Sequence, residues 1–271
     1  MLKKRRFSVI GVGIGGWIYE PWRDNFYPKG LPQAKELAFA SKALTSIEIN
    51  STYYGSQKPA SFTKWASETP DDFVFSVKGP RFTTNRKVLA ESGESIARFF
   101  DSGVTKLGAK LGPVVWQFAP TKKFDPDDFG AFLSLLPAEA DGLALRHALE
   151  VRHESFVSEG FVKLARKHGA GIVLADSEDY PLIADVSGGF AYMRLQRSQA
   201  KEKTGYPAKE IKAWTERALA MSRGEAPPGL PLLAKPTAKK KHDVFVYVIS
   251  GAKERAPHGA QAIIAELSKA G

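Results

Sequence analysis

The sequence predicts an α/β protein with the fold of a single (β/α)8 TIM-type barrel, an eight-stranded parallel sheet closed on itself. Eight short runs of β-branched and apolar residues recur along the chain, and segments with helical spacing separate most of them. Alternating strands and helices imply parallel pairing, and eight such units in 271 residues match this barrel. A doubly wound open sheet is the alternative, but one domain of that kind usually needs fewer strands. No change of composition divides the chain, so we expect one domain over residues 1–271.

The eight strand-like runs share apolar or β-branched residues at most positions. They span residues 7–13, 46–50, 73–78, 113–118, 147–152, 171–176, 190–196 and 243–250. In the segments between them, apolar residues recur at the three- and four-residue spacing of a helix face. Helices are therefore predicted over residues 33–43, 59–68, 92–106, 127–136, 157–168, 208–221 and 259–270.

Local signals set several of the predicted boundaries. Asp125-Pro126 provides a capping residue and a first-turn proline, and His168-Gly169 has the pattern of a helix end. Pro181 interrupts the segment after the sixth strand, so we expect a short or irregular helix there. Residues 222–242 are rich in proline and lysine, which predicts a long exposed loop before the last strand.

The composition excludes several classes of protein. Hydrophobic residues make up 43% of the chain and charged residues 25%, which is typical of a globular protein and not of a disordered or collagen-like one. The chain has no cysteine, which excludes disulfides, thiol catalysis, thiolate zinc sites and iron–sulfur clusters. No apolar run is long enough to span a membrane, and the N-terminus lacks a signal-peptide pattern. We expect a soluble, unprocessed, cytoplasmic protein with no membrane contact.

The chain carries a formal net charge of +10, and an excess of this size raises nucleic acid as a partner. Most of the excess belongs to two segments. A basic N-terminal tail, residues 1–6, has four Lys and Arg residues, and the loop 222–242 has four lysines between positions 235 and 241. Any contact with nucleic acid is therefore expected through these basic segments and not across a face of the barrel.

Side-chain alternation selects the residues that point into the barrel. Successive side chains of a strand face opposite sides, so we assign the apolar parity to the helices and the other parity to the interior. The polar inward residues fall at the C-terminal ends of their strands, where barrels of this kind carry their active sites. They are Glu48, Asn50, Lys78, Gln117, Glu150, Arg152, Asp176, Tyr192 and Arg194.

This set of charges has two interpretations. Buried charges need partners, so the acidic and basic side chains could form a structural network that neutralises itself. We favour a catalytic or ligand-binding mouth, because a barrel is able to fill its interior with aliphatic side chains and this one does not.

The segment 150–153 combines a carboxylate, a guanidinium and an imidazole. Glu150, with Glu48 or Asp176, is predicted to supply acid and base catalysis, and His153 a second acid or base. The alternative is that Glu150 pairs with a neighbouring cation and that His153 only forms hydrogen bonds within a loop.

The cations of the mouth are predicted to hold a phosphate or carboxylate of the substrate. These cations are Lys78, Arg152 and Arg194. Glu48, Asp176 and His153 carry ligand types that suit magnesium or manganese. We do not favour a divalent metal, because the cations already supply positive charge, and we assign no metal ligands.

Gly11 to Gly16 follow the pattern G-x-G-x-x-G after the first strand. That pattern indicates dinucleotide binding only where a helix begins directly behind it, and here a loop-like aromatic stretch follows. No nucleotide cofactor is therefore expected, and any other cofactor is unknown. Trp17 and Tyr53 would suit a sugar or base ring near the mouth, with loop packing as the alternative.

Several motifs occur in a characteristic order along the chain. They are Gly15-Gly16-Trp17, Glu48-Ile49-Asn50-Ser51-Thr52-Tyr53, Phe75-Ser76-Val77-Lys78, Gln117, Glu150-Val151-Arg152-His153, Leu174-Ala175-Asp176 and Tyr192-Met193-Arg194. In this order they resemble the YecE-like family, domain-of-unknown-function family number 72. The resemblance covers nearly the whole chain and implies a TIM-type barrel with these residues at its mouth. It implies no established activity.

The chain departs from the pattern of that family at several positions. Asn85 stands where the family usually has a histidine, and Gln196-Arg197 replaces a His-Gly pair after the seventh strand. Ile249-Ser250 replaces a pair of asparagines, and Gly259 replaces a further one. These changes remove imidazole and amide groups from one side of the mouth, which leaves open whether this member keeps the ligand or the catalysis of the family.

We expect an enzyme that acts on a small anionic or sugar-like molecule by acid–base chemistry at the mouth. Asn50, Gln117 and Tyr192 are expected to contact the substrate beside the cations. A nucleic-acid-binding or processing module, or a non-catalytic interaction scaffold, are the alternative functions. The sequence leaves the substrate, the reaction and the oligomeric state open.

Overall fold

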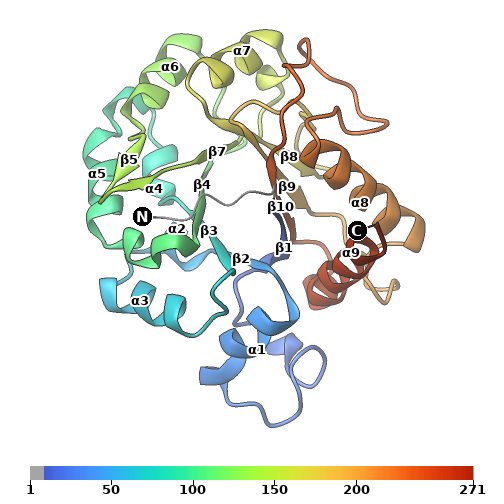
Figure 1. Cartoon of the computed structure of the whole chain (residues 1–271). Helices are drawn as coiled ribbons and strands as arrows, with labels where there is room; N and C mark the ends of the chain where they lie inside the picture. Colours follow the sequence, from blue (N-terminus) through green and yellow to red (C-terminus); the bar gives the residue numbers. More distant parts are fainter. Residues whose placement is uncertain (1–8, 271) are drawn as a thin grey trace.

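The computed structural model describes residues 9–270, which form a closed barrel of eight parallel strands (Figure 1). The order around the barrel is β1-β10-β9-β8-β7-β4-β3-β2, and pairing of β1 with β10 closes it. This confirms the predicted fold class. The strands are β1 Ile10–Gly15, β2 Ser46–Ile49, β3 Val74–Lys78, β4 Leu111–Gln117, β7 His147–Glu150, β8 Gly171–Asp176, β9 Phe190–Leu195 and β10 Asp243–Val248.

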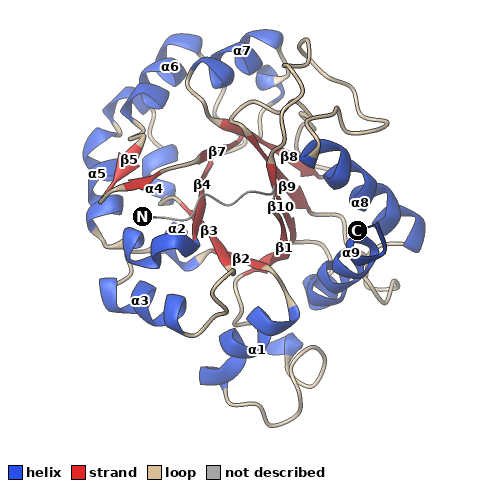
Figure 2. Ribbon diagram, viewed as in Figure 1, coloured by secondary structure: helices blue, strands red, loops and turns tan. Residues whose placement is uncertain are grey.

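The helices surround the strands on the outside (Figure 2). They are α1 Glu36–Ala43, α3 Pro59–Ser67, α5 Gly93–Asp101, α6 Pro126–Leu135, α7 Glu159–Lys167, α8 Ala208–Ser222 and α9 Ala256–Ala270. Two short helices directly follow β2 and β3, and they were not predicted. These are α2 Ser51–Tyr54 and α4 Arg81–Thr84.

Two further elements differ from the prediction for local reasons. The helix expected over 92–106 ends at Asp101, because Gly103 adopts φ +93 and starts the 3-10 segment Val104–Lys110. A two-stranded hairpin, β5 Glu139–Ala140 and β6 Leu143–Ala144, lies between α6 and β7. The basic tail 1–6 and the first two residues of the predicted first strand lie outside the described residues.

The predicted helix signals are confirmed. The Asp125 carboxylate accepts hydrogen bonds from the backbone N–H groups of Asp127 and Asp128, which satisfies free donors at the start of α6. Gly169 follows α7 with φ +64, a left-handed conformation that favours glycine at a helix end. After β8, the chain between 177 and 189 forms no regular helix.

Two apolar layers stabilise the barrel. The outer layer lies between strands and helices, and its strand residues include Ile47, Leu149 and Met193. The inner layer fills the barrel and consists of Val74, Val115, Ala148, Val173, Phe190, Tyr192, Phe245, Tyr247 and Ile249. The Tyr247 hydroxyl shares 2.6 Å hydrogen bonds with Ser46 and Ser76 inside the barrel. The interior of the barrel is therefore filled by side chains between its two ends.

Residues 223–242 connect α8 to the beginning of β10 without regular secondary structure, as predicted (Figure 1). The buried Asp185 carboxylate accepts hydrogen bonds from the backbone N–H groups of Leu233 and Ala234, which holds this loop to the barrel. Lys239, Lys240 and Lys241 are exposed. Among residues 9–270, none of the helices has the length and apolar character needed to cross a bilayer.

Candidate active site at the barrel mouth

A cavity of about 500 Å³ opens at the C-terminal ends of the strands, the end of the barrel at which the sequence predicted a site. Its volume lies within the range of small-molecule sites. The residues that line it come from the ends of β1, β2, β3, β4 and β9 and from the loops behind β1, β2, β7 and β10. They are Gly15, Gly16, Trp17, Ile18, Ile49, Asn50, Ser51, Tyr54, Lys78, Gln117, Arg152, Arg194, Ile249, Ser250 and Lys253.

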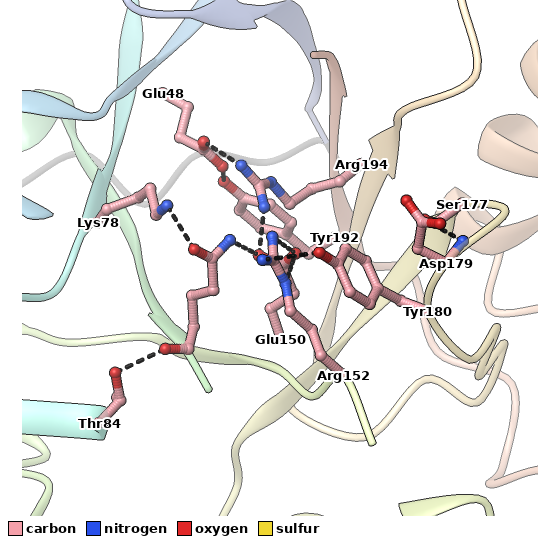
Figure 3. Close-up of polar contacts among 11 residues, drawn as sticks. Glu48, Lys78, Thr84, Glu150, Arg152, Ser177, Asp179, Tyr180, Tyr192 and Arg194 are labelled. Carbon is pink, nitrogen blue, oxygen red and sulfur yellow. Dashed lines mark hydrogen bonds and ion pairs between the residues drawn. The ribbon is translucent and has the colours of Figure 1, made fainter. Parts of the chain in front are cut away.

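The floor of the cavity is a buried chain of ion pairs (Figure 3). The Arg194 guanidinium contacts Glu48 on one side, at 3.0 Å from Nη2 to Oε1, and Glu150 on the other. Glu150 also accepts from Arg152, with 2.9 Å between Nη2 and Oε1. Tyr192 completes the coordination of Glu48 by donating its hydroxyl proton over 2.7 Å. Both carboxylates are therefore paired with cations or hydrogen-bond donors. These residues form the self-neutralising network that was one of the two interpretations of the sequence.

The network determines the ionisation of Glu150. Burial opposes its negative charge, but the charges of Arg194, Arg152 and Lys78 outweigh that effect and lower the pKa of Glu150 to about 2. At neutral pH this carboxylate holds no proton to donate and is a poor base. The predicted acid–base role of Glu150 is therefore not supported by its surroundings.

Lys78 differs from the other cations of the mouth. Lys78 is only 6% exposed, and it forms no ion pair with any residue of the described chain. The ammonium donates to Oε1 of Gln117 over 3.0 Å and lies 3.8 Å from the centroid of the Tyr53 ring. Burial, together with the charge of Arg194, lowers the pKa of Lys78 to about 8. Lys78 is thus a buried amine that changes its protonation state near neutral pH.

The orientation of Gln117 follows from strand register. Residues Gln117 of β4 and Glu150 of β7 are paired neighbours, and the Gln117 amide nitrogen donates to Oε2 of Glu150 over 2.7 Å. Its carbonyl oxygen therefore faces Lys78. The Thr84 hydroxyl of α4 donates to the backbone carbonyl of Gln117 over 2.6 Å, which anchors the same residue through its main chain.

The cavity has an excess of positive charge. The network of Glu48, Glu150, Arg152 and Arg194 is neutral as a group, so Lys78 adds one positive charge when it is protonated. Lys253, in the loop behind β10, lines the cavity as well and lies 4.2 Å from the ring centroid of Tyr19. The sequence prediction missed Lys253, although barrel sites are built from such loops.

Two polar atoms of the lining lack hydrogen-bond partners within the described residues. They are Oδ1 of Asn50 and Nε of Arg194, both buried. Asn50 fits against the backbone of Gly15: a Cβ added there would lie 2.6 Å from its Nδ2 atom. Gly15 thus leaves the space that Asn50 occupies, in line with the close approach expected of these glycines.

An apolar wall with exposed side chains borders the charged floor. Trp17 packs edge-on against Trp65, with 5.1 Å between ring centroids. Ile18 is 56% exposed and Tyr54 is 72% exposed, although both line the cavity. Ser250, on the same cavity, has φ +65, a conformation that costs free energy for a residue with a side chain.

The prediction that Asp176 points into the mouth is wrong. Val173 belongs to the inner layer, whereas Ile172 and Leu174 belong to the outer one, so Asp176 faces outward. There its carboxylate accepts from Nε of Arg197 over 2.6 Å and from the Tyr206 hydroxyl over 3.1 Å. Asp176 anchors the segment behind β9 and does not line the cavity.

The placement of His153 at the mouth is also wrong. Its Nδ1 atom accepts from the backbone N–H of Ser155 over 3.1 Å and lies 2.9 Å from the Ser155 hydroxyl. His153 thereby caps the 3-10 turn Glu154–Phe156. This is the loop hydrogen bonding that was the alternative.

The remaining predicted residues occupy different places. Asn50, Gln117 and Trp17 line the cavity, whereas Tyr53 packs on Lys78 and Tyr192 lies beneath Glu48. Within residues 9–270 no three histidine, aspartate or glutamate side chains gather as ligands of a metal ion would. The trio of Glu48, Asp176 and His153, considered for a divalent cation, is therefore dispersed.

Of the departures from the family pattern, Ile249 and Ser250 line the cavity. Asn85 follows α4 as its C-terminal cap, and Gly259 belongs to α9, next to the backbone carbonyl of Thr204. The Gln196 side-chain nitrogen is buried without a partner in the described chain. Only the change at 249–250 alters the wall of the cavity directly.

Comparison with known proteins agrees with this fold. A family profile described as "Protein of unknown function DUF72" matches residues 11–271. A DUF72 family protein from Thermotoga maritima has a similar structure, with a TM-score of 0.74 and 22% identity over 96% of this chain and 99% of that chain. A DUF72 family protein from Enterococcus faecalis gives a TM-score of 0.70 and 18% identity, over 96% of this chain and 98% of that one.

The UPF0759 protein YunF of Bacillus subtilis is 28% identical over 117 residues, which is 41% of this chain. The match spans 40% of the length of that relative. A Family GH18 chitinase from Chromobacterium violaceum shares the fold at a TM-score of 0.55 and 10% identity, over 97% of this chain and 83% of that chain. At such identities a structural likeness establishes the fold alone.

Proposed function

The chain belongs to the DUF72 family of proteins of unknown function, and from this premise we propose that its mouth cavity binds and converts a small molecule with one phosphate or carboxylate group. The substrate would place its anionic group on the cations of the cavity and its carbon skeleton along the apolar wall. The chemistry would be proton transfer, with Lys78 as the group that accepts and returns the proton.

The observation that carries this proposal is the positive charge in the cavity that no carboxylate of the described residues balances. Glu48 pairs with Arg194, and Glu150 pairs with Arg194 and Arg152. Within the described residues no carboxylate pairs with Lys78 or Lys253, and both line the cavity. A buried cation without an acidic partner is costly to a folded protein. An anionic ligand would supply the missing charge in a site of low dielectric, where the attraction is strong.

The shape of the cavity supports a small substrate with polar groups on a carbon skeleton. A volume of about 500 Å³ accommodates a molecule of that size. Trp17 and Tyr54 offer aromatic faces of the kind that pack on a sugar ring. Oδ1 of Asn50 accepts no hydrogen bond from residues 9–270, and a substrate hydroxyl would satisfy it.

The acid–base role moves from Glu150 to Lys78. A general base works best when its pKa lies near the operating pH, and the pKa of Lys78 is about 8 whereas that of Glu150 is about 2. Glu150 would instead serve as a positioning residue, because it orients both Gln117 and Arg152.

The test is binding of defined anions, measured by calorimetry at pH 7 and low salt. The ligands are inorganic phosphate, acetate and a set of sugar phosphates, and we expect saturable binding at one site, with the sugar phosphates tightest. Lys78→Met and Lys253→Met each remove one cation and should weaken binding about tenfold or more. Lys212→Met removes an exposed lysine of α8 and should leave binding unchanged.

Two outcomes would contradict the proposal. One is the absence of binding by every anion of the set, and the other is equal weakening by all three methionine variants, which would indicate a nonspecific effect of net charge. A sugar phosphate that binds then becomes the starting point of an activity search by nuclear magnetic resonance, in which proton exchange at its carbon atoms is followed in heavy water.

Nucleic acid is not favoured as the ligand of this site. The basic loop 223–242 leads into the start of β10, so its lysines lie at the end of the barrel opposite to the cavity. A polyanion held by these lysines would not reach Lys78. Affinity for DNA and RNA across a salt series measures this alternative separately, since such binding falls steeply with salt.

A further inference from the structure

We propose that the Lys78 amine acts as a nucleophile, which forms an imine with an aldehyde or ketone group of the substrate. This inference rests on the proposed function for the cavity and its anionic ligand, and it gives Lys78 a covalent role in place of direct acceptance and return of a proton. It narrows the substrate to a carbonyl compound that also bears a phosphate or carboxylate. Oxo acids and phosphorylated aldoses and ketoses belong to this class.

The first support is the environment of the amine. A lysine in an ion pair is held as an ammonium, whereas imine formation needs a free lone pair. Lys78 is 6% exposed and its polar partner is the neutral carbonyl oxygen of Gln117, at 3.0 Å. That oxygen accepts from an amine as well as from an ammonium, so deprotonation of Lys78 does not break the contact.

The second support is how the neighbouring charges are arranged. Glu150 acts on the amine through its charge but forms no ion pair with it within the described residues, because it is engaged by Arg194, by Arg152 and by the Gln117 amide. Arg194 instead places a positive charge near Lys78, which favours the neutral amine. A cationic neighbour and a dry pocket are the two devices that activate nucleophilic lysines.

The third support is the space in front of the amine. Lys78 lines the cavity together with Arg152 and Lys253, whose charged groups come from other loops of the mouth. A carbonyl carbon next to Lys78 would therefore leave the anionic end of the same small molecule within the reach of a second cation. The ring of Tyr53, 3.8 Å from Nζ, shields the amine from another side.

The step balances without any further reactant. The lone pair of Nζ attacks the carbonyl carbon and forms a C–N bond, while the carbonyl π electrons move to the oxygen, which takes up a proton. The carbinolamine then loses this oxygen as water, and a C=N bond remains. The two hydrogens of the water come from the amine nitrogen. Protonation of the imine nitrogen makes it an electron sink for the adjacent carbon atom.

The experiment is reductive trapping on the wild-type protein. Glyoxylate, which has an aldehyde and a carboxylate, is added at pH 7 with cyanoborohydride, and the modified lysines are mapped by peptide mass spectrometry. At pH 7, a lysine with a pKa of about 8 has roughly a three-hundredfold larger fraction of free amine than an ordinary one with a pKa of 10.5. We expect at least about tenfold more adduct on Lys78 than on the exposed Lys212. Inorganic phosphate should suppress this adduct by competition.

Two arginine variants provide the matched controls. Lys78→Arg keeps the charge and removes the nucleophile, so the dominant adduct should disappear, whereas Lys212→Arg should trap like the wild type. Should Lys78→Arg not fold, the mapping on wild-type protein still decides the question. Adducts spread evenly over exposed lysines, or concentrated on Lys253, would overturn the inference.

The result also separates this inference from the proposed function. Saturable binding of inorganic phosphate without an adduct on Lys78 would refute the nucleophile and leave the anion site in place. Failure of both phosphate binding and trapping would refute the two together.

Discussion

The Lys78 amine donates a 3.0 Å hydrogen bond to the side-chain oxygen of Gln117, and no carboxylate of the described chain forms an ion pair with it. The relationship is unusual because two carboxylates, Glu48 and Glu150, lie in the same floor of the barrel. Both form ion pairs with Arg194. The mouth therefore contains a neutral network of paired charges and, beside it, one amine that is able to change its charge.

Lys78→Met is expected to change the pH dependence of stability. The folded-state pKa of Lys78, about 8, lies below its ordinary value of 10.5. Between these values the unfolded chain binds more protons, so the free energy of unfolding of the wild type rises with pH relative to the variant. We expect Lys78→Met to have its largest stability advantage below pH 8, and that advantage to fall by up to about 3 kcal/mol towards pH 10.5. Urea titrations from pH 7 to 10 measure it; a pH-independent difference would contradict the lowered pKa.

Glu150→Gln is expected to destabilise the protein strongly. The substitution removes the carboxylate that Arg194 and Arg152 share and leaves buried guanidinium charge without compensation. Breaking a buried pair in this way costs about 3–5 kcal/mol. The control is Glu94→Gln, which breaks an exposed helical pair with Arg98 and should leave the free energy of unfolding nearly unchanged. Equal effects in urea unfolding would show that the floor network contributes little.

Gly15→Ala is expected to weaken ligand binding more than stability. Its Cβ would lie 2.6 Å from Nδ2 of Asn50 and 2.8 Å from Cγ2 of Ile249, so both side chains must move within the cavity. We expect the affinity for the best-binding sugar phosphate to fall about tenfold, since the acceptor Asn50 is displaced. Gly55→Ala is the matched control, because a Cβ there meets no atom within 4 Å. Calorimetric titration of both variants decides; unchanged affinity in Gly15→Ala would remove Asn50 from the binding site.

Asp176→Asn is expected to affect stability alone. Its carboxylate accepts from Arg197 and Tyr206 on the outer face of the barrel, away from the cavity. Loss of a buried charged acceptor costs about 1–3 kcal/mol, whereas anion affinity and the trapping of Lys78 should stay at wild-type values. A drop in affinity without loss of stability would restore the inward position that the sequence predicted for Asp176.

The alternation of side chains predicted the inward residues wherever a strand has one apolar parity. Ile47 and Ile49 on β2, and Ala191, Met193 and Leu195 on β9, marked the outer face, so Glu48 and Arg194 were assigned correctly to the interior. The sixth strand, Gly171–Asp176, is apolar at every position before Asp176 because both of its faces are buried. In such a strand the alternation of polar and apolar residues does not distinguish the two faces, so the sequence did not show which way Asp176 points.

By itself, then, the sequence determined the barrel and the end at which its polar groups meet, because strand and helix periods are local properties of the chain. Which charges pair was decided only by tertiary structure: Glu48 and Arg194 are 146 positions apart, and their contact depends on closure of the sheet. The position of His153 likewise depends on a local contact, since its Nδ1 atom accepts a hydrogen bond from the backbone N–H of Ser155. Because Glu48 and Glu150 pair with arginines, Lys78 is left without an ion pair in the described chain. This could be recognised only from the tertiary structure, which shows the partners of both carboxylates.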